Sequence, residues 1–369
     1  MRILFMILFF VIVLVAHVYT TLRLWQVLPN ATWLKWLATV VYNVSFVCFF
    51  LFGAMTMLNG KIGTFGLSTF IYEMGTSYIF VLLYATILFG LCDLLRLLHV
   101  LPTNFLRDNL WGTMTTVGLL FVVFLYGNIH YKTKYKETLT DKTEKAIAKP
   151  LKVVFLSDLH IGYHNQRAEL ARWIDIINVE NPDLILMGGD VIDFSVTPLL
   201  EQDMAKEFHR LKAPVYACLG NHEYLAGVNK AMRFYDSASI NLLKDGVAQL
   251  SDLGVVIIGR DDKTNPERKS LSALMKNVTE GQYTFVLDHQ PFHLEEAEES
   301  GVDYQLSGHT HYGQVWPITW LIDALYEDGY GVYQKGKTHY YVSSGMGIWG
   351  GKFRIGTRSE YVVLEVSRK

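Results

Sequence analysis

Four long apolar stretches in the first third of the chain restrict its fold more than any other feature. Each has the length of about 20 mostly apolar residues that an α-helix needs to cross a bilayer. They are Ile3–Leu22, Leu37–Leu58, Tyr78–Leu98 and Leu110–Ile129. Polar and turn residues separate the stretches, and tryptophans lie near several ends, as in the aromatic belts of membrane proteins. The sequence therefore predicts an all-α transmembrane region of four helices over residues 1–130.

Other interpretations of these stretches are less favoured. The first would be long for a cleaved signal peptide, and no clean small-x-small cleavage site follows it. The other three would be unusually long and poor in charge for buried helices of a soluble core. Asp93 lies close to Arg96, so a local ion pair is favoured over an intramembrane functional carboxylate.

The charges around the stretches bear on the orientation in the membrane. Four spans place both ends of the chain on one side, together with five cationic residues, Arg2, Lys61, Lys132, Lys134 and Lys136. Four others fall on the opposite side, Arg23, Lys35, Arg96 and Arg107. The positive-inside rule then predicts a cell-membrane protein whose part after residue 130 is cytoplasmic, by a margin of one residue.

The whole-chain charge and the cysteines exclude some classes. The formal net charge is −2, so there is no global basic field that would indicate a nucleic-acid partner. The three cysteines are scattered and indicate neither a disulfide framework nor a thiolate zinc site. A reducing compartment suits them.

In the mixed globular sequence after residue 130, five short apolar runs end in polar residues that can bind metal ions. The runs are Val153–Leu156, Asp183–Met187, Val215–Leu219, Tyr283–Leu287 and Tyr304–Leu306. The motifs that follow them are Ser157-Asp158-Leu159-His160, Gly188-Gly189-Asp190, Gly220-Asn221-His222-Glu223, Asp288-His289 and Gly308-His309-Thr310-His311. Open α/β sheets bind ligands beyond the carboxyl ends of their strands. Mixed oxygen and imidazole donors suit intermediate divalent metals.

The segments between the motifs complete a layered α/β pattern. Helical patterns fit Arg167–Asn178, Thr197–Lys212, Val228–Ser237 and Lys269–Asn277. Tyr131–Leu139 alternates with a period of two, which predicts a strand with a solvated lysine face. A polybasic contact with anionic lipid headgroups is the alternative for these lysines. Asp141–Pro150 is expected to be a polar turn.

As a set, the five motifs resemble those of the calcineurin-like metallophosphoesterase superfamily, and closely its membrane-associated bacterial branch. That branch is similar to transmembrane metallophosphoesterases and to relatives that cleave the pyrophosphate of a UDP-linked diacylated glucosamine. The resemblance covers residues 131–369 and implies an α/β fold, a four-layer α/β/β/α sandwich. The expected organisation is thus a transmembrane region over 1–130 and a metallophosphoesterase domain over 131–369.

The resemblance also implies a site for two divalent metal ions, with manganese, iron or zinc as the fitting metals. The first ion would be held by Asp158, His160, Asp190 and His311. The second would be held by Asp190, Asn221, His289 and His309, so that Asp190 bridges the pair.

His222 is expected to act as the catalytic residue rather than as a ligand. By resemblance it donates a proton or a hydrogen bond to the phosphoryl or leaving-group oxygen. Glu223 is expected to orient His222, as carboxylates often orient histidines around metal sites. His164 and His293 lie near motifs and are weaker candidates for the pocket wall, whereas His209 and His339 are expected to be ordinary polar residues.

The predicted function is a membrane-anchored, metal-dependent phosphoesterase that hydrolyses a phosphoester or pyrophosphate bond with a hydroxide activated between two metals. The expected partners are membrane lipids and a phosphorylated small-molecule or lipid substrate, the lipid-linked class by analogy. Val315–Ile322 is apolar and would contact acyl chains or the bilayer, or else form a packed cover. Trp349–Arg354 would wrap a phosphate or form a surface hairpin.

Two other function classes compete with this prediction. A transporter or sensor with a regulatory phosphoesterase-like domain need not keep a ligand at every position, as this chain does. A nuclease of the same superfamily is disfavoured by the weak net charge and the membrane half.

Overall fold

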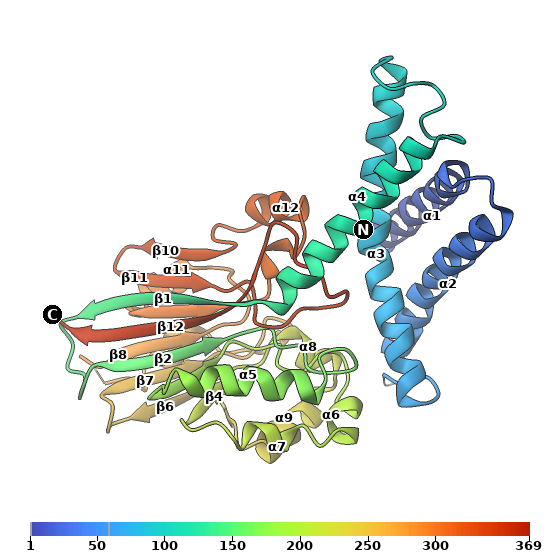
Figure 1. Ribbon diagram of the computed structural model, residues 1–369. Helices are drawn as coiled ribbons and strands as arrows, with labels where there is room; N and C mark the ends of the chain where they lie inside the picture. Colours follow the sequence, from blue (N-terminus) through green and yellow to red (C-terminus); the bar gives the residue numbers. More distant parts are fainter. Residues whose placement is uncertain (1, 58–59, 280) are drawn as a thin grey trace. The chain divides into compact units, whose positions relative to one another are not determined.

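The computed structural model describes residues 2–57, 60–279 and 281–369. They form two compact units (Figure 1). Among the described residues, the helical unit is built from 2–57, 62–128 and 350–352, and the α/β unit from 60–61, 129–279, 281–349 and 353–369.

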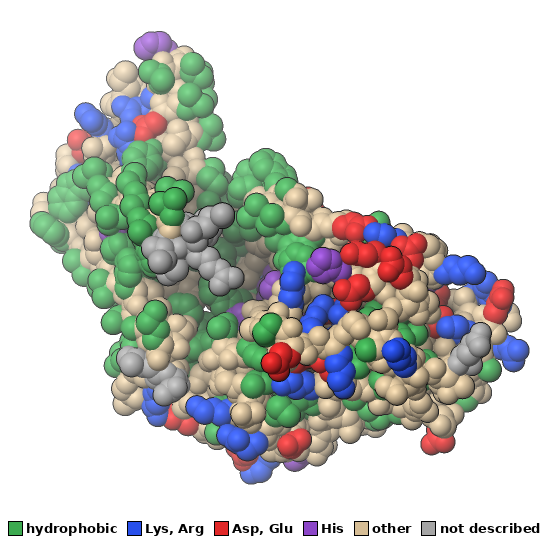
Figure 2. Space-filling view, turned by 180° about the vertical axis from the view of Figure 1, so that it is seen from behind, with side chains coloured by type: hydrophobic (Ala, Val, Ile, Leu, Met, Phe, Trp, Pro, Cys, Tyr) green, Lys and Arg blue, Asp and Glu red, His purple; other side chains and the backbone are tan. Residues whose placement is uncertain are grey.

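The helical unit contains four helices, α1 (Arg2–Val27), α2 (Thr32–Met57), α3 (Phe65–Leu97) and α4 (Leu110–Lys132). All four are long and apolar enough to cross a membrane. Exposed apolar side chains cover much of this unit (Figure 2). The prediction of four such helices is therefore confirmed, although Leu58, the expected end of the second stretch, lies outside the described residues.

The third helix starts well before the predicted Tyr78. It begins at Phe65, where the Thr64 side chain caps the first turn by accepting a hydrogen bond from the Leu67 backbone N–H. The added turns carry Glu73, glycines and hydroxyl side chains. These turns were not predicted because a search for long apolar stretches stops at such residues. The same residues can nevertheless form a helix.

Several charged and polar side chains inside the helical unit pair with one another. Asp93 forms the expected pair with Arg96, at 2.9 Å, and a second pair with Arg23, at 2.6 Å. The His17 ring lies 3.2 Å from Asn43 Oδ1 and 2.9 Å from the Tyr78 hydroxyl. Such interhelical hydrogen bonds satisfy polar groups that lipid cannot.

The α/β unit is built on two six-stranded sheets (Figure 1). The first has the order β1-β12-β2-β3-β4-β5, with β1 (Lys134–Thr143), β12 (Ser359–Arg368), β2 (Leu151–Leu156), β3 (Leu184–Met187), β4 (Val215–Ala217) and β5 (Asn241–Leu242). The second has the order β10-β11-β9-β8-β7-β6, with β10 (Gly331–Lys335), β11 (Thr338–Val342), β9 (Tyr304–Ser307), β8 (Tyr283–Leu287), β7 (Val255–Gly259) and β6 (Gly246–Leu250).

Helices cover the outer faces of both sheets. On the first sheet lie α5 (Arg167–Val179), α6 (Thr197–Glu201), α7 (Ala205–Phe208), α8 (Asn221–Leu225) and α9 (Val228–Ser237). On the second lie α10 (Leu271–Met275) and α11 (Glu295–Glu299). A 3-10 turn η1 (His311–Gly313) and helix α12 (Ile318–Leu325) follow β9. The four-layer α/β/β/α prediction is therefore confirmed.

Alternation along β2 shows how the layers are held together. Val154 and Leu156 pack under the helices, whereas Val153 and Phe155 point into the core between the sheets. Successive side chains of a strand point to opposite faces, so a strand that is apolar on both faces belongs in the interior of a layered structure. The strand ends are thereby fixed in a rigid frame.

Several local predictions were wrong in their bounds. Thr197–Lys212 is not one helix but the two short helices α6 and α7, with Asp203 in a left-handed conformation (φ 54°) between them. The helix predicted over Lys269–Asn277 is only α10, which starts after the capping side chain of Ser270.

The strand predicted over Tyr131–Leu139 begins only at Lys134, because α4 continues to Lys132. It extends through Thr143, shortening the expected turn, because it pairs with β12 over its whole length.

Candidate metal centre

The seven predicted ligands lie on loops at the carboxyl ends of strands from both sheets. Four follow β2, β3 and β4 of the first sheet: Asp158, His160, Asp190 and Asn221. Three follow β8 and β9 of the second sheet: His289, His309 and His311. The strands within each set run parallel to one another, so their ends share one edge of the sheet.

The first predicted group converges around one small space. His311 Nε2 lies 3.5 Å from Asp158 Oδ1 and 3.1 Å from His160 Nε2. His160 Nε2 lies 3.8 Å from the same Asp158 oxygen. Each residue offers one ligand atom, and these atoms all lie within 4.8 Å of one another. The group can therefore hold a metal ion.

Asp190 connects this group to the second one through a single oxygen. Its Oδ2 atom lies 3.7 Å from His160 Nε2 and 3.1 Å from His289 Nε2. Its other oxygen, Oδ1, accepts a hydrogen bond of 2.9 Å from the His222 backbone N–H. The carboxylate is thus held with one oxygen facing both groups of histidines.

The second predicted group comprises the remaining ligands. The ligand atoms of Asp190, His289 and His309 lie within 4.8 Å of one another. Asn221 Oδ1 lies 3.2 Å from His289 Nε2. The opposite nitrogen of His289, Nδ1, donates to the Gly188 carbonyl at 2.7 Å, which leaves Nε2 for the site.

The backbone of the site is strained. Five of the seven predicted ligands adopt a left-handed conformation, with φ between 45° and 71°: Asp158, His160, Asp190, His309 and His311. A non-glycine residue in this region costs of order 1–3 kcal/mol and persists only where the surroundings enforce it. Such residues gather at functional sites, and here they coincide with the side chains that converge.

Two glycines allow the close approach of the loops. A Cβ atom on Gly220 would lie 2.1 Å from Asp190 Oδ1, and one on Gly308 would lie 2.3 Å from Asp158 Oδ2. Any other residue would displace a carboxylate of the site. The glycines in these motifs are therefore required by the packing of the ligands.

Comparison with known proteins agrees with this geometry. A model of the calcineurin-like phosphoesterase family matches residues 151–313. An uncharacterized metallophosphoesterase of Campylobacter jejuni is 32% identical over 259 residues, covering 68% of this chain and 68% of the relative. The chain belongs to the calcineurin-like phosphoesterase family. An uncharacterized metallophosphoesterase of Helicobacter pylori is 29% identical over 276 residues, covering 72% of this chain and 71% of the relative.

The name of another relative mentions both a transmembrane protein and a metallophosphoesterase domain. The transmembrane protein with metallophosphoesterase domain of Danio rerio is 31% identical over 231 residues, covering 57% of this chain and 52% of that protein. The predicted family and enzyme class are thus confirmed: the chain is a metal-dependent phosphoesterase. Its clustered carboxylates and imidazoles point to divalent metal ions.

The pKa values of the predicted ligands in this phosphoesterase are shifted in both directions. Burial would raise the pKa of Asp158, but the neighbouring His311 and His160 hold that pKa below its ordinary value. Burial lowers the pKa of His309 to about 4 and that of His311 well below its ordinary value. The carboxylate is therefore charged and these two imidazoles are neutral at pH 7. Burial would also lower the pKa of His160 and His289, but Asp158 and Asp193 raise the pKa of His160 to about 10, and Asp190 holds that of His289 well above its ordinary value. A metal ion that binds these two imidazoles therefore has to displace their protons.

The environment of His222 corrects one sequence prediction. Glu223 does not orient it, because the Glu223 carboxylate accepts hydrogen bonds from the backbone N–H groups of Gly220, Asp190 and Ile192, at 2.7, 3.1 and 2.9 Å. With the Tyr235 hydroxyl, which donates at 3.1 Å, these donors use the acceptor sites of both oxygens and leave none for an imidazole. Glu223 instead fixes the loops that carry Asp190 and Asn221.

Asp193 takes the place assigned to Glu223. Its Oδ1 atom lies 3.2 Å from His222 Nδ1 and 3.4 Å from His160 Nδ1. Burial opposes its charge, but the adjacent His160 and His222 imidazoles hold the pKa of Asp193 below its ordinary value. The sequence reasoning missed this residue, although it lies only three positions after Asp190 on the same loop.

Other residues near the motifs have structural partners. His164 is buried with Nε2 3.0 Å from the Ile348 carbonyl, and His293 is exposed beside Glu295, so neither lies among the predicted ligands. Asp288, next to the ligand His289, forms buried ion pairs with Arg260 at 2.9 Å and Arg268 at 3.1 Å.

The Arg354 side chain is not available to wrap a phosphate. It is fully buried, and its guanidinium donates to four backbone carbonyls, those of His311, Ser344, Gly345 and Gly347. These contacts connect the His311 loop to the segment after β11. Arg354 therefore fixes the backbone of the loop that carries the predicted ligand His311.

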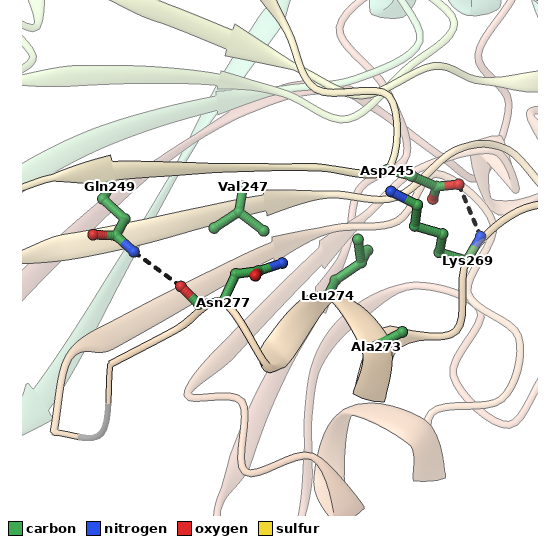
Figure 3. Close-up of a pocket in the computed structure, with 7 residues that line it drawn as sticks. All are labelled: Asp245, Val247, Gln249, Lys269, Ala273, Leu274 and Asn277. Atoms are coloured by element: carbon green, nitrogen blue, oxygen red, sulfur yellow. Dashed lines mark hydrogen bonds between the residues drawn. The ribbon is translucent and has the colours of Figure 1, made fainter.

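One pocket of the α/β unit lies apart from the ligands. It has a volume of about 630 Å³ and is lined by Asp245, Val247, Gln249, Lys269, Ala273, Leu274 and Asn277 (Figure 3). Two of its polar groups are already used, since Gln249 donates to the Asn277 carbonyl and the Lys269 backbone N–H donates to Asp245. None of its lining residues is a predicted ligand.

Proposed function

We propose that this phosphoesterase hydrolyses a phosphoester or pyrophosphate bond with two divalent metal ions that share Asp190. The observation that carries the proposal is the position of Asp190 Oδ2, within 3.7 Å of His160 Nε2 and 3.1 Å of His289 Nε2. A single carboxylate oxygen between two groups of imidazoles suits a shared ligand. Manganese, iron and zinc all accept this mixture of carboxylate, amide and imidazole donors.

The bound ions would supply an acidified water and neutralise charge on the phosphoryl oxygens. The chain's own residues do the rest. Asn221 contributes an uncharged oxygen, which limits the negative charge facing an anionic substrate. His222, whose side chain is 13% exposed beside buried Asp193, is placed to donate a proton or hydrogen bond to a phosphoryl or leaving-group oxygen.

We further propose that the substrate carries a lipid tail. Support comes from the segment that follows the loop of His309 and His311. It exposes Trp316 just before α12, and Trp320, Leu321 and Leu325 on α12. Exposed apolar patches of this kind mark interaction surfaces, and tryptophan favours the lipid headgroup region. In addition, Thr133 alone separates α4 from β1, so the α/β unit follows a membrane-type helix without a flexible linker.

The orientation we propose is cytoplasmic for the α/β unit. It rests on the excess of lysine and arginine on that side of the four predicted spans. Reporter proteins fused after residue 369 and between α3 and α4 should be active in opposite compartments. A reporter after residue 369 that is active only outside the cytoplasm would overturn the orientation.

Catalysis is best tested with the full chain in lipid nanodiscs. Metal-stripped protein would be reloaded with Mn²⁺, Fe²⁺ or Zn²⁺ and given nitrophenyl mono- and diesters, a diacylated nucleotide pyrophosphate and its deacylated analogue. We expect metal-dependent hydrolysis that Asp190→Ala abolishes, and a higher kcat/KM for the acylated pyrophosphate. Failure of every ester and pyrophosphate with every metal would refute the reaction.

A matched pair of variants tests the lipid tail separately. Leu321→Asp changes the exposed face of α12, whereas Val179→Asp makes the same kind of change at the exposed end of α5. We expect Leu321→Asp to lower kcat/KM for the acylated pyrophosphate only, and Val179→Asp to leave it unchanged. Equal rates on acylated and deacylated substrates in the unmodified protein would contradict the lipid-linked class.

A further inference from the structure

Asn165 fastens the loop that carries His160. Asn165 is fully buried, and its Nδ2 atom donates to the Leu159 carbonyl at 3.0 Å and to the His160 carbonyl at 3.1 Å. The same nitrogen lies 3.2 Å from the Ile348 carbonyl. One side chain therefore fixes both peptide groups that flank the backbone of a predicted ligand, and connects them to the segment after β11.

His160 needs such support. Its φ of 45° is left-handed, and its own N–H donates to the Asp190 carbonyl at 3.0 Å. A strained residue keeps its conformation only while its neighbours enforce it. If the two carbonyls held by Asn165 were released, the loop could relax and turn the imidazole away from Asp158 and Asp190.

Tyr131 contacts the other end of the Asn165 amide. The Tyr131 hydroxyl lies 2.7 Å from Asn165 Oδ1 and 2.7 Å from Glu169 Oε1. The loop carbonyls require Nδ2 on their side, which leaves Oδ1 facing Tyr131. The hydroxyl has one proton, so it donates to Oδ1 or to the Glu169 carboxylate at a given moment, and when it donates to Oδ1 it holds the far end of the amide in place. Tyr131 is fully buried, and the Lys134 ammonium lies 3.9 Å above its ring.

Tyr131 does not belong to a strand, as the sequence predicted, but to the last turn of α4. From Ile129 onward this helix is part of the α/β unit. We propose that Tyr131 and Asn165 are positioning residues for His160, so that the end of α4 is part of the scaffold of the metal centre. The inference rests on the proposed function in taking His160 as a metal ligand.

The test uses the metal-stripped full chain and needs no substrate. Mn²⁺ binding would be measured by calorimetric titration, alongside the thermal unfolding midpoint. We expect Asn165→Ala to weaken Mn²⁺ binding roughly 10–100-fold, as is typical for groups that orient a ligand. Tyr131→Phe keeps the ring and removes one hydroxyl, so we expect a loss of about 3–10-fold, the size of one hydrogen bond.

Tyr361→Phe is the matched control. The Tyr361 hydroxyl donates to Glu180 at 2.8 Å, so this change also removes a partly buried tyrosine–glutamate hydrogen bond, but outside the His160 loop. It should lower the unfolding midpoint much as Tyr131→Phe does and leave Mn²⁺ affinity unchanged. Equal Mn²⁺ affinities for Tyr131→Phe, Tyr361→Phe and the unmodified chain would overturn the proposal.

The double variant tests whether Tyr131 acts through Asn165. If it does, Asn165→Ala with Tyr131→Phe should bind Mn²⁺ about as Asn165→Ala does, whereas multiplied losses would show independent effects and refute the series. Should Asn165→Ala fail to fold, the comparison of Tyr131→Phe with Tyr361→Phe decides alone. Normal Mn²⁺ binding without hydrolysis of any substrate would count against the proposed function and leave this inference standing.

Discussion

His222→Ala removes an imidazole whose Nδ1 lies 3.2 Å from Asp193 Oδ1, while the neighbouring predicted ligand Asn221 stays in place. Positioned acid–base groups contribute about 10²–10⁴-fold to catalysis. We therefore expect kcat to fall by about that factor, which corresponds to ~2.7–5.5 kcal/mol of activation free energy. Metal content should not change, because His222 is not expected to hold an ion.

Asp193 makes the prediction quantitative, because it contacts two histidines. If the 3.2 Å ion pair between Asp193 and His222 tightens to a charge-assisted hydrogen bond when substrate binds, it contributes about 1.5–3 kcal/mol, so Asp193→Asn alone should lower kcat roughly 10–150-fold. In the double variant, His222→Ala with Asp193→Asn, the contribution of Asp193 that acts through His222 has already been lost. Only the contact with His160, at 3.4 Å, can add to the deficit. The double variant should thus lie within about tenfold of His222→Ala instead of showing the product of the two losses.

The assay is steady-state hydrolysis of two diesters, one with a nitrophenolate leaving group and one with a poor leaving group, together with elemental analysis of the bound metal. A good leaving group needs little protonation, so the deficit of His222→Ala should be smallest on the nitrophenyl diester. An equal loss on both substrates would instead indicate stabilisation of a phosphoryl oxygen. Loss of metal in His222→Ala, or fully multiplicative losses in the double variant, would refute the assigned roles.

Three further outcomes are expected. Asp190→Ala should lose metal from both groups of ligands and Asp158→Ala mainly from one, so full occupancy in Asp190→Ala by elemental analysis would contradict the bridging role. Asp288→Ala leaves the buried Arg260 guanidinium without one of its carboxylates. The free energy of unfolding should therefore fall by about 3–5 kcal/mol and Tm by roughly 6–20 °C. An unchanged Tm would contradict this expectation. Burial raises the pKa of Asp328 to about 6, above its unfolded value of about 3.9, so stability should fall as pH rises from about 4 to 6. In urea unfolding, Asp328→Asn should gain about 1–3 kcal/mol at pH 8 and nothing at pH 4, and an equal gain at both would refute the pKa argument.

The sequence predicted the fold and the ligand set best where the signal is local. Each predicted ligand comes a few residues after an apolar run, so identifying the strand also placed the side chain at the end of the sheet. Asp193 lacked such a signal, because its role depends on His222, which lies on a different loop. Glu223 was adjacent to His222 in sequence, but it bonds backbone N–H groups that no residue type reveals.

The bounds of elements were harder to predict for a related reason. The alternation that begins at Tyr131 suggested a strand. The hydrogen-bonding partners of the Tyr131 hydroxyl, Asn165 and Glu169, stabilise instead a helical turn at Tyr131, and they are more than 30 residues away in the sequence. The extension of β1 to Thr143 likewise depends on β12, more than 200 residues away. Pairing over such distances leaves no periodic signal in either segment.

This long-range pairing has a consequence for how the protein is made. β1 pairs with β12 at every position from Lys134 with Ser359 to Thr143 with Arg368, and the first of these pairs spans 359 − 134 = 225 residues. At a synthesis rate of about 5–20 residues per second, β1 waits roughly 10–45 s for the strand it pairs with. During that time β1, which directly follows α4, exposes an unpaired strand edge that can pair with the wrong strand. The first sheet can be completed only after residue 368 has left the ribosome. A nascent chain stalled before β12 would therefore carry four of its seven predicted metal ligands on loops of an incomplete sheet.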